Sequence, residues 1–215
     1  MIDREGVIKF NLEHEETVAI NRPIVAELNH WRSVLADLGL IGADPHRYGG
    51  LGFGNLSARL QGDEFLITGS QTGLLAELTA HHYAHVLDSC LELNKVWSRG
   101  PIAPSSEALT HASIYSANWN IRFVFHCHSP DIWANAARFG IPVTSDQQSY
   151  GTPELAAEVL KLVSGFSPGS SGLFAMGGHL DGVVAYARSA GYTGNALVNA
   201  LTAARQQAGS HNRIN

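Results

Sequence analysis

The sequence predicts an α/β domain in which helices and strands interleave along the chain. Three observations lead to this prediction. Apolar residues recur at helical spacing after Pro23, they alternate at strand spacing before Pro130, and the two patterns follow one another over most of the sequence. There is no internal repeat and no low-complexity linker, and 215 residues suffice for one substantial core. We therefore expect a single domain over residues 1–215.

Helix signals mark four segments. The first begins near Pro23 and carries apolar residues at helical spacing up to a glycine, which favours a helix end. The second lies in PSSEALTHASIYSA, with Ser105 or Ser106 as its cap. The third, GTPELAAEVLKLV, has Thr152 as cap and Pro153 at its first position. GNALVNALTAARQQA is expected to form a closing helix before a polar tail.

Strand signals lie between these helices. Short strands are expected around Leu56–Leu60, in EFLITGS, and in IRFVFHCHSP, where apolar residues alternate as far as Pro130. GLFAMGGH and GVVAYA predict two more strands. The segment ELTAHHYAHVLDSCLEL is interpreted as helical or mixed.

Composition excludes several classes of protein. A net charge of −5 at pH 7 gives no reason to expect nucleic acid or an anionic membrane as partner. No apolar run reaches the roughly 18 residues of a spanning helix, and the charged start MIDREGVIKFNLEHEE is not a signal peptide. Nothing requires Cys90 and Cys127 to pair, so a cytoplasmic location is expected. Eleven histidines against three lysines favour metal chemistry over Schiff-base chemistry.

The stretch FVFHCHSP places two histidines in an apolar strand. Side chains two residues apart on a strand share a face, so His126 and His128 point together. They are either core histidines bonded to neighbours or two ligands of a metal site. Glu107 upstream and His179 downstream supply an acid and a third imidazole. Three histidines around a zinc ion, with one position open, form a catalytic rather than a structural site.

Two other patterns are weaker. Gly50, Gly52 and Gly54 approach a dinucleotide-binding pattern, but neither the preceding strand nor the following acidic residue is present. A loop whose backbone amides approach an anion is favoured instead. His81 and His85 are four residues apart and would share one helical face, yet the glutamate of a His-Glu-x-x-His motif is missing. An exposed or structural role is favoured for this pair.

Six motifs occur in an order that resembles the class II aldolase/adducin family. They are GNLSAR, LITGSQTG, PSSE, HCHSP, YGTPEL and a histidine near a glycine before a valine-rich strand, and the resemblance covers about residues 50–190. The resemblance implies a three-layer α/β/α fold with a central, mainly antiparallel sheet. It also implies a homotetramer with active sites between subunits, and a divalent metal, usually zinc, held by three histidines.

The resemblance also assigns site residues. By position, His126 and His128 are the first two metal ligands and Glu107 is the catalytic acid/base. The third ligand is His179 or Asp181, and His179 is favoured because imidazole keeps the ligand set and its charge. The implied phosphate cradle comprises Gly54, Asn55, Thr72, Gly73, Ser105 and Ser106. The loop TGSQTG is two residues longer than the family's usual stretch, which reshapes one side of this cradle.

The implied function is that of a metal-dependent lyase. It would cleave a small, phosphorylated keto sugar by a reversible aldol reaction through a metal-bound enediolate, with Glu107 moving the proton. Glutamate after the two serines resembles the family's aldolases and dehydratase, whereas its epimerases carry aspartate. An epimerase, dehydratase or decarboxylase on the same site, and a non-catalytic adducin-like association domain, are the alternatives. The tyrosine that a neighbouring subunit contributes in the family has no clear counterpart, and Tyr150 occupies an aromatic packing position.

Overall fold

The computed structural model describes residues 6–165 and 171–211, so the first residues of the charged N-terminal segment and part of the polar tail lie outside it. The main sheet is built from β1 (Asn11–Glu16), β4 (Asn55–Arg59), β5 (Phe65–Thr68), β6 (Tyr83–Cys90), β7 (Lys95–Gly100), β8 (Phe123–His128), β9 (Gly172–Ala175) and β10 (Gly182–Ala187). Their order is β1-β7-β6-β5-β4-β8-β10-β9. The strands β1 and β7 are parallel and the other neighbours are antiparallel. Two short strands, β2 (Gly42–Ala43) and β3 (Gly52–Phe53), form a separate pair.

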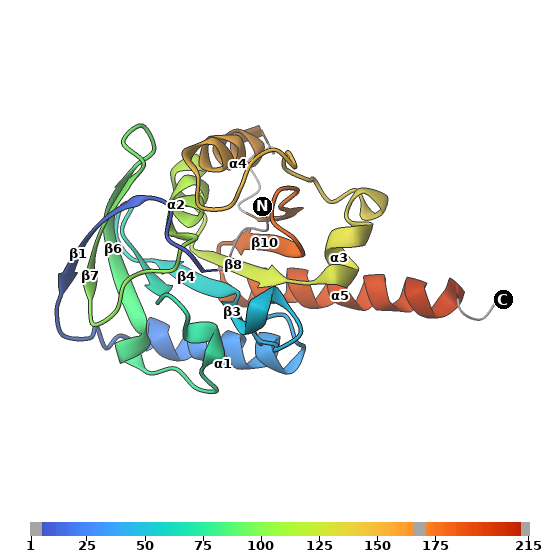
Figure 1. Ribbon diagram of the computed structural model, residues 1–215, viewed down its shortest axis with the longest axis horizontal. Coiled ribbons are helices and arrows are strands. Elements are labelled where there is room, and N and C mark those ends of the chain that lie inside the picture. The colour runs from blue at the N-terminus through green and yellow to red at the C-terminus, as the bar shows by residue number, and fades with distance from the viewer. Residues whose placement is uncertain (1–5, 166–170, 212–215) are drawn as a thin grey trace.

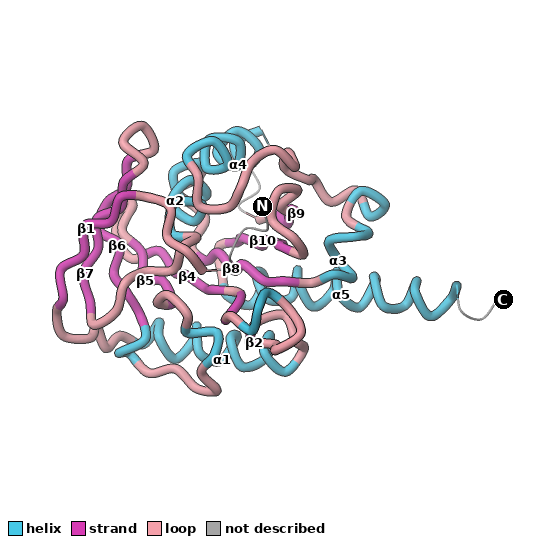
Figure 2. The backbone as a smooth tube through the Cα atoms, in the orientation of Figure 1, coloured by secondary structure: helices cyan, strands magenta, loops and turns pink. Residues whose placement is uncertain are grey.

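Helices cover both faces of the main sheet (Figures 1 and 2). They are α1 (Pro23–Asp37), α2 (Ala108–Ala117), α3 (Pro130–Asn135), α4 (Pro153–Gly165) and α5 (Ala190–His211). The helices α2 and α4 share one apolar core with the sheet, and α1, α3 and α5 share the other. The predicted three-layer α/β/α fold with a mainly antiparallel sheet is confirmed. None of the helices in the described ranges has both the length and the apolar character needed to cross a bilayer.

Strand β8 lies between β4 and β10 and is buried on both faces. Phe125 and Cys127 belong to the core on the α1 and α5 side, whereas Val124 belongs to the core under α2 and α4. Alternation along the strand then places His126 and His128 on the same side as Val124. The prediction that the two histidines share a face is confirmed.

Several predicted helix boundaries are also confirmed. The helix α4 begins at Pro153, and the Thr152 hydroxyl accepts a hydrogen bond from the Leu155 N–H at 3.3 Å. The helix α1 begins at Pro23. Beyond its last residue, Gly39 adopts a φ of 74° and donates its N–H to Ala36 O at 2.9 Å, which is the backbone conformation that glycine supplies at helix ends.

The segment predicted as helical or mixed is an extended strand. After a short 3-10 turn at Ala80–His82, the chain forms β6, which pairs with β5 and β7. Sheet pairing on both sides and the burial of Ala84 and Val86 override the local sequence preference. His81 and His85 therefore do not share a helical face. His85 Nε2 lies 2.8 Å from Glu64 Oε2, a structural contact of the kind favoured for this pair.

Helix α2 begins later than predicted. Ser105 and Ser106 precede the helix, Glu107 is its N-cap residue, and Ala108 is the first helical residue. Ser105 Oγ accepts a hydrogen bond from the Glu107 N–H at 3.3 Å, which stabilises the turn rather than the helix itself. The two serines and Glu107 are buried at this turn. The prediction of a serine cap was wrong because the backbone still turns at Ser105 and Ser106, and the helical conformation begins only after Glu107.

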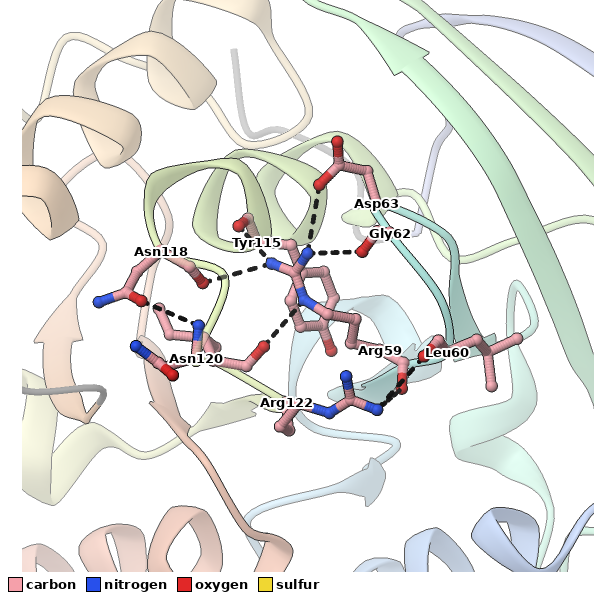
Figure 3. Close-up of polar contacts among 9 residues, drawn as sticks. Arg59, Leu60, Gly62, Asp63, Tyr115, Asn118, Asn120 and Arg122 are labelled. Atoms are coloured by element: carbon pink, nitrogen blue, oxygen red, sulfur yellow. Dashed lines mark hydrogen bonds and ion pairs between the residues drawn. The ribbon is translucent and has the colours of Figure 1, made fainter.

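Arg59, at the end of β4, holds the opposite end of α2 (Figure 3). Its buried guanidinium donates to the carbonyl oxygens of Tyr115, Asn118 and Ile121. The last carbonyls of a helix have no partner within the helix, and they carry partial negative charge. Arg59 adds a donor beside the Asn118 N–H, which also donates to Tyr115 O, and it brings positive charge to this end; it thereby fixes α2, whose first turn follows Glu107.

Candidate metal centre and active site

Three imidazole rings converge on the α2 and α4 side of the sheet. The strand β8 carries His126 and His128, whose Nε2 atoms lie 3.1 Å apart. His179 comes from the turn between β9 and β10, and its Nε2 lies 3.0 Å from His128 Nε2. Antiparallel pairing of Gly182 with His128 brings that turn beside β8. One ligand atom from each of the three rings lies within 4.8 Å of the others.

All three rings are buried, and burial decides their charge. At most 5% of any of these side chains is exposed. Desolvation lowers the pKa of His126 to about 4 and also lowers the pKa values of His128 and His179, with additional repulsion from neighbouring histidines. The neutral imidazole is the form that binds metal ions, so burial favours the protonation state that metal binding requires.

The geometry of this histidine cluster fits a divalent metal. In a tetrahedral zinc site with Zn–N distances of about 2.0–2.1 Å, two ring nitrogens lie roughly 3.3–3.4 Å apart. The observed Nε2 separations of 3.0 and 3.1 Å are close to this value. A neutral imidazole has at most one N–H, so His128 Nε2 donates to only one of the two nitrogens that it approaches. Three ring nitrogens this close together are therefore explained better by one shared cation than by hydrogen bonds between the rings.

Asp181, the alternative third ligand, is engaged elsewhere. Its Oδ2 accepts a hydrogen bond from the Tyr48 hydroxyl at 2.7 Å and lies 3.7 Å from Arg47 Nη2. The Tyr48 ring in turn packs edge-on against His128, with ring centroids 4.6 Å apart. Among the described residues, the candidate metal-binding group contains His179 and not Asp181. The geometry thus supports His179 as the predicted third ligand, with Asp181 orienting the tyrosine beside His128.

Glu107 lies at the edge of the histidine cluster. Its Oε1 is 3.8 Å from His179 Nε2, and only 1% of the side chain is exposed. Neither carboxyl oxygen makes a hydrogen bond to the described part of the chain. Burial raises the pKa of Glu107 to about 7. A carboxyl group with this pKa can hold or release a proton near neutral pH, as a general acid or base must.

The six predicted cradle residues line one small polar pocket. Besides Gly54, Asn55, Thr72, Gly73, Ser105 and Ser106, its lining includes Gly6, Gly52, Gly69, Ser70 and Gln71. Asn55 pairs with His126 across β4 and β8, so the pocket adjoins the histidine cluster. The Asn55 Oδ1 atom is buried and has no hydrogen-bond partner among the described residues. Backbone amides, hydroxyls and an amide side chain can together hold an anion.

Gly54 is required by the backbone at this position. It has a φ of 79°, which L side chains rarely adopt. A Cβ atom there would lie 2.7 Å from Ile41 Cγ1 and 3.2 Å from His126 O. Glycine therefore lets β4 approach β8 where the cradle meets the histidines.

Five of these lining residues were not predicted from the sequence, and Gln71 and Gly6 show why. Gln71 has a left-handed φ of 60°, and its Oε1 accepts a hydrogen bond from the Gly52 N–H at 3.3 Å. It lies in the lengthened loop TGSQTG, so the extra loop length was the available signal. Gly6 approaches the pocket from the start of the chain, and no local pattern marks that contact.

Comparisons with known proteins agree with this arrangement. The family model of the class II aldolase and adducin N-terminal domain matches residues 43–207. Among solved structures, an l-fuculose-1-phosphate aldolase from Thermus thermophilus superimposes with a TM-score of 0.64 at 21% identity, covering 87% of this chain and 94% of that one. YgbL from Klebsiella pneumoniae gives 0.60 at 20%, covering 85% and 86%. A sugar-phosphate aldolase from Thermotoga maritima gives 0.61 at 17%, covering 84% and 91%.

A sequence search of curated proteins gave no match. The structural likenesses lie below 25% identity and show a shared fold. The family model is more specific, because its matched range includes Gly54, Glu107 and all three clustered histidines. By this match over most of its length, the chain belongs to the class II aldolase and adducin family.

Proposed function

We propose that this protein is a divalent-metal-dependent lyase that cleaves a small phosphorylated keto sugar by a reversible aldol reaction. The observation that supports this most is the convergence of three buried, neutral imidazoles beside the buried carboxyl group of Glu107. Two of the similar structures are aldolases named for sugar-phosphate substrates. A homotetramer with sites between subunits, as the resemblance implies, is part of the proposal.

Zinc is the metal that we propose for the site. The resemblance to the family implies a divalent cation, and zinc favours neutral imidazole ligands at separations close to those seen here. Three protein ligands leave a position open for substrate. When bound, the metal supplies a Lewis acid that stabilises the negative charge developing on the substrate carbonyl oxygen.

Glu107 and the cradle divide the remaining work. The hydroxyl groups of Ser105 and Ser106, the Asn55 amide and the loop N–H groups would hold the phosphate, which fixes the substrate relative to the histidines. In the cleavage direction, the hydroxyl group two carbons from the ketone would lose its proton to solvent and become an aldehyde. The bond between the α and β carbons breaks, and its electron pair stays on the α carbon of the ketone fragment. Glu107 then delivers a proton to that carbon, and its pKa near neutrality permits the reverse step in synthesis.

Other reactions would use the same groups. YgbL is considered as an aldolase, epimerase or decarboxylase, and each of these reactions passes through a negative charge next to a carbonyl group. A non-catalytic association domain has no need of a buried carboxyl group beside three neutral imidazoles, which is a costly arrangement without a ligand. We therefore favour an enzyme over an association domain.

A retro-aldol assay tests the proposal. The zinc-loaded protein would be incubated with a panel of ketose 1-phosphates, including l-fuculose 1-phosphate, and release of the ketone fragment measured by a coupled reduction. We expect turnover with at least one member of the panel, loss of turnover with a chelator, and its return on adding Zn²⁺. Turnover that survives complete removal of metal would contradict the proposal.

A further inference from the structure

Two residues beside the histidine cluster have a backbone conformation that residues other than glycine rarely adopt. Tyr48 has a φ of 51° and Asp181 has a φ of 62°. For a residue as bulky as tyrosine, the left-handed region is a strained conformation. Strain of this kind persists only where the surrounding contacts fix it, and it gathers at functional sites and ligand clamps. The contacts of these two residues therefore indicate what the strain maintains.

The two strained residues are bonded to each other. The Tyr48 hydroxyl donates a hydrogen bond to Asp181 Oδ2 at 2.7 Å, across 133 positions in the chain. The guanidinium group of Arg47 donates to the same hydroxyl, and its Nη2 lies 3.7 Å from Asp181 Oδ2. Only 13% of the Asp181 side chain is exposed, so this charge-assisted hydrogen bond is largely shielded from water. We call the hydrogen bond between Tyr48 and Asp181 the clasp.

The clasp joins two segments that flank the metal ligands. Tyr48 belongs to the loop between β2 and β3, and its ring packs edge-on against His128 with centroids 4.6 Å apart. Asp181 lies two residues after His179, at the end of the turn that leads into β10. The Asp181 carbonyl oxygen also accepts a hydrogen bond from the Ser129 N–H at 2.8 Å, directly after His128. The clasp therefore ties the turn that carries His179 to the ring that packs against His128.

The ligand rings have little room to turn while the clasp is closed. Phe53 lies against both Tyr48 and His128, with ring centroids 5.2 and 5.5 Å away. On the other side of the clasp, a Cβ atom on Gly182 would lie only 2.5 Å from His179 Cδ2. A chelated cation leaves when its ligand rings turn away from it. Contacts that hold these rings in place therefore slow its release.

We propose that Tyr48 is a positioning residue that retains the metal ion in the histidine cluster through its hydrogen bond to Asp181. This inference rests on the proposed function, because it takes the cluster to hold a divalent cation. Opening of the clasp frees the turn that carries His179 and the ring beside His128 together, so the strength of the clasp sets the rate of metal release. Contacts that orient metal ligands in this way contribute about 10- to 100-fold to metal affinity.

The rate of zinc release tests the clasp. The zinc-loaded full chain would be mixed with an excess of a chelating indicator, and the transfer of zinc would be followed by absorbance. Tyr48→Phe keeps the ring and removes the hydroxyl, Asp181→Ala removes the acceptor, and Asp181→Asn keeps an acceptor oxygen. Because alanine at a φ of 62° adds strain of its own, Tyr48→Phe is also measured in the Asp181→Ala background. Tyr192→Phe, which removes the hydroxyl of an exposed tyrosine of α5, is the matched control.

We expect Tyr48→Phe to release zinc about tenfold faster or more than the unsubstituted protein. In the Asp181→Ala background the same substitution should change the rate by less than about twofold, because its partner is already absent. Asp181→Asn should release zinc much more slowly than Asp181→Ala, and Tyr192→Phe should match the unsubstituted protein.

Unchanged zinc release in Tyr48→Phe would overturn the inference and leave metal binding, and with it the proposed function, in place. An equal effect of Tyr48→Phe in both backgrounds would also overturn it, because the hydroxyl would then act independently of Asp181. If the unsubstituted protein held no zinc, the proposed function and the inference would fail together.

Discussion

Glu107 is the single residue on which the proposed chemistry depends most. A buried carboxyl group without a hydrogen bond is unfavourable for stability, and such groups are typical of functional sites. We predict that Glu107→Gln keeps its metal but lowers kcat by about 100-fold or more, the usual contribution of a positioned acid or base. Metal analysis and steady-state kinetics would measure the two effects. Glu64→Gln, which changes an acid that contacts the remote His85, is the matched control, and a normal kcat in Glu107→Gln would remove this residue from the mechanism.

The raised pKa of Glu107 also predicts a pH effect on the metal-free protein. Its pKa is about 7 in the fold and 4.5 ordinarily, so its contribution to stability is present below pH 4.5 and is lost as the pH rises through 7. Glu107→Gln removes this loss. The variant should therefore gain stability relative to the unsubstituted protein between pH 5 and pH 8, by on the order of 2–3 kcal/mol. Urea unfolding of both metal-free proteins measures it, and a difference independent of pH would contradict the assignment.

The histidines change stability with pH in the opposite direction to Glu107. The pKa of His126 is lowered to about 4 from 6.5, so its contribution to the stability of the metal-free protein is present above pH 6.5 and is lost as the pH falls towards 4. Because only neutral imidazoles bind a cation, acid should also release the metal. Glu107→Gln should therefore still lose stability as the pH falls towards 4, because His126 is unchanged in this variant. This separates the effect of the histidine from that of the glutamate.

At the scale of residues, sequence reasoning found the groups whose placement follows from local rules. Alternation along a strand placed His126 and His128 on one face, and the motif order pointed to Glu107. Lys9 and Tyr150 meet across 141 positions in the chain through tertiary packing, which no local pattern encodes. Their contact becomes visible only when the chain start is placed beside the turn at Tyr150.

At the scale of elements, α2 is held at both of its ends, and Arg59 holds the end far from Glu107. Arg59→Ala would remove the buried guanidinium that donates to three carbonyl oxygens, and Tyr115 O and Asn118 O would keep only their backbone donors. We predict a loss of about 3 kcal/mol or more in the free energy of unfolding. Urea denaturation would measure it against Arg138→Ala, which removes an exposed arginine and should change stability by less than about 0.5 kcal/mol. Equal stability of the two variants would show that Arg59 is not needed to anchor α2.

The approach of β4 to β8 gives a second prediction at this scale. Gly54→Ala adds both left-handed strain and a clash with Ile41, whereas Gly62→Ala adds strain alone, since a Cβ on Gly62 meets no atom within 4 Å. Strain of this kind costs on the order of 1 kcal/mol, and overpacking adds about 1–3 kcal/mol. Thermal or urea unfolding should therefore show Gly54→Ala as clearly the less stable variant. Indistinguishable stabilities would contradict the close packing seen here.

Elements with strong local signals were predicted, and elements that depend on pairing were not. Thr152 and Pro153 predicted the start of α4, and the alternation of apolar residues predicted β8. The strands β1 and β7 carry mixed, partly exposed residues and are stabilised by their pairing at the sheet edge, so their sequences gave no strand signal. The strand β6 was misassigned because the four-residue spacing of His81 and His85 also fits one face of a helix, and the pairing with β5 and β7 that forms the strand cannot be read from this segment alone.

At the scale of the whole molecule, the sheet positions the site by separating two cores. The α1 and α5 side is filled by apolar residues, whereas the α2 and α4 side accommodates three neutral imidazoles among its apolar residues. The histidines come from β8 and from the turn before β10, and Glu107 comes from the start of α2, so the cluster forms only when these layers assemble. A bound metal would therefore stabilise the folded state by mass action.

The central claim is that these layers bring three histidines together around one divalent cation. Metal analysis of purified protein, unsubstituted and with His128→Ala, tests it most directly, because His128 Nε2 lies next to both other ring nitrogens. His81→Ala, which removes a histidine outside the cluster, is the control, and circular dichroism confirms that each variant is folded. We predict about one metal ion per chain in the unsubstituted protein and in His81→Ala, and a loss of most of it in folded His128→Ala. Undiminished metal in His128→Ala would contradict the account.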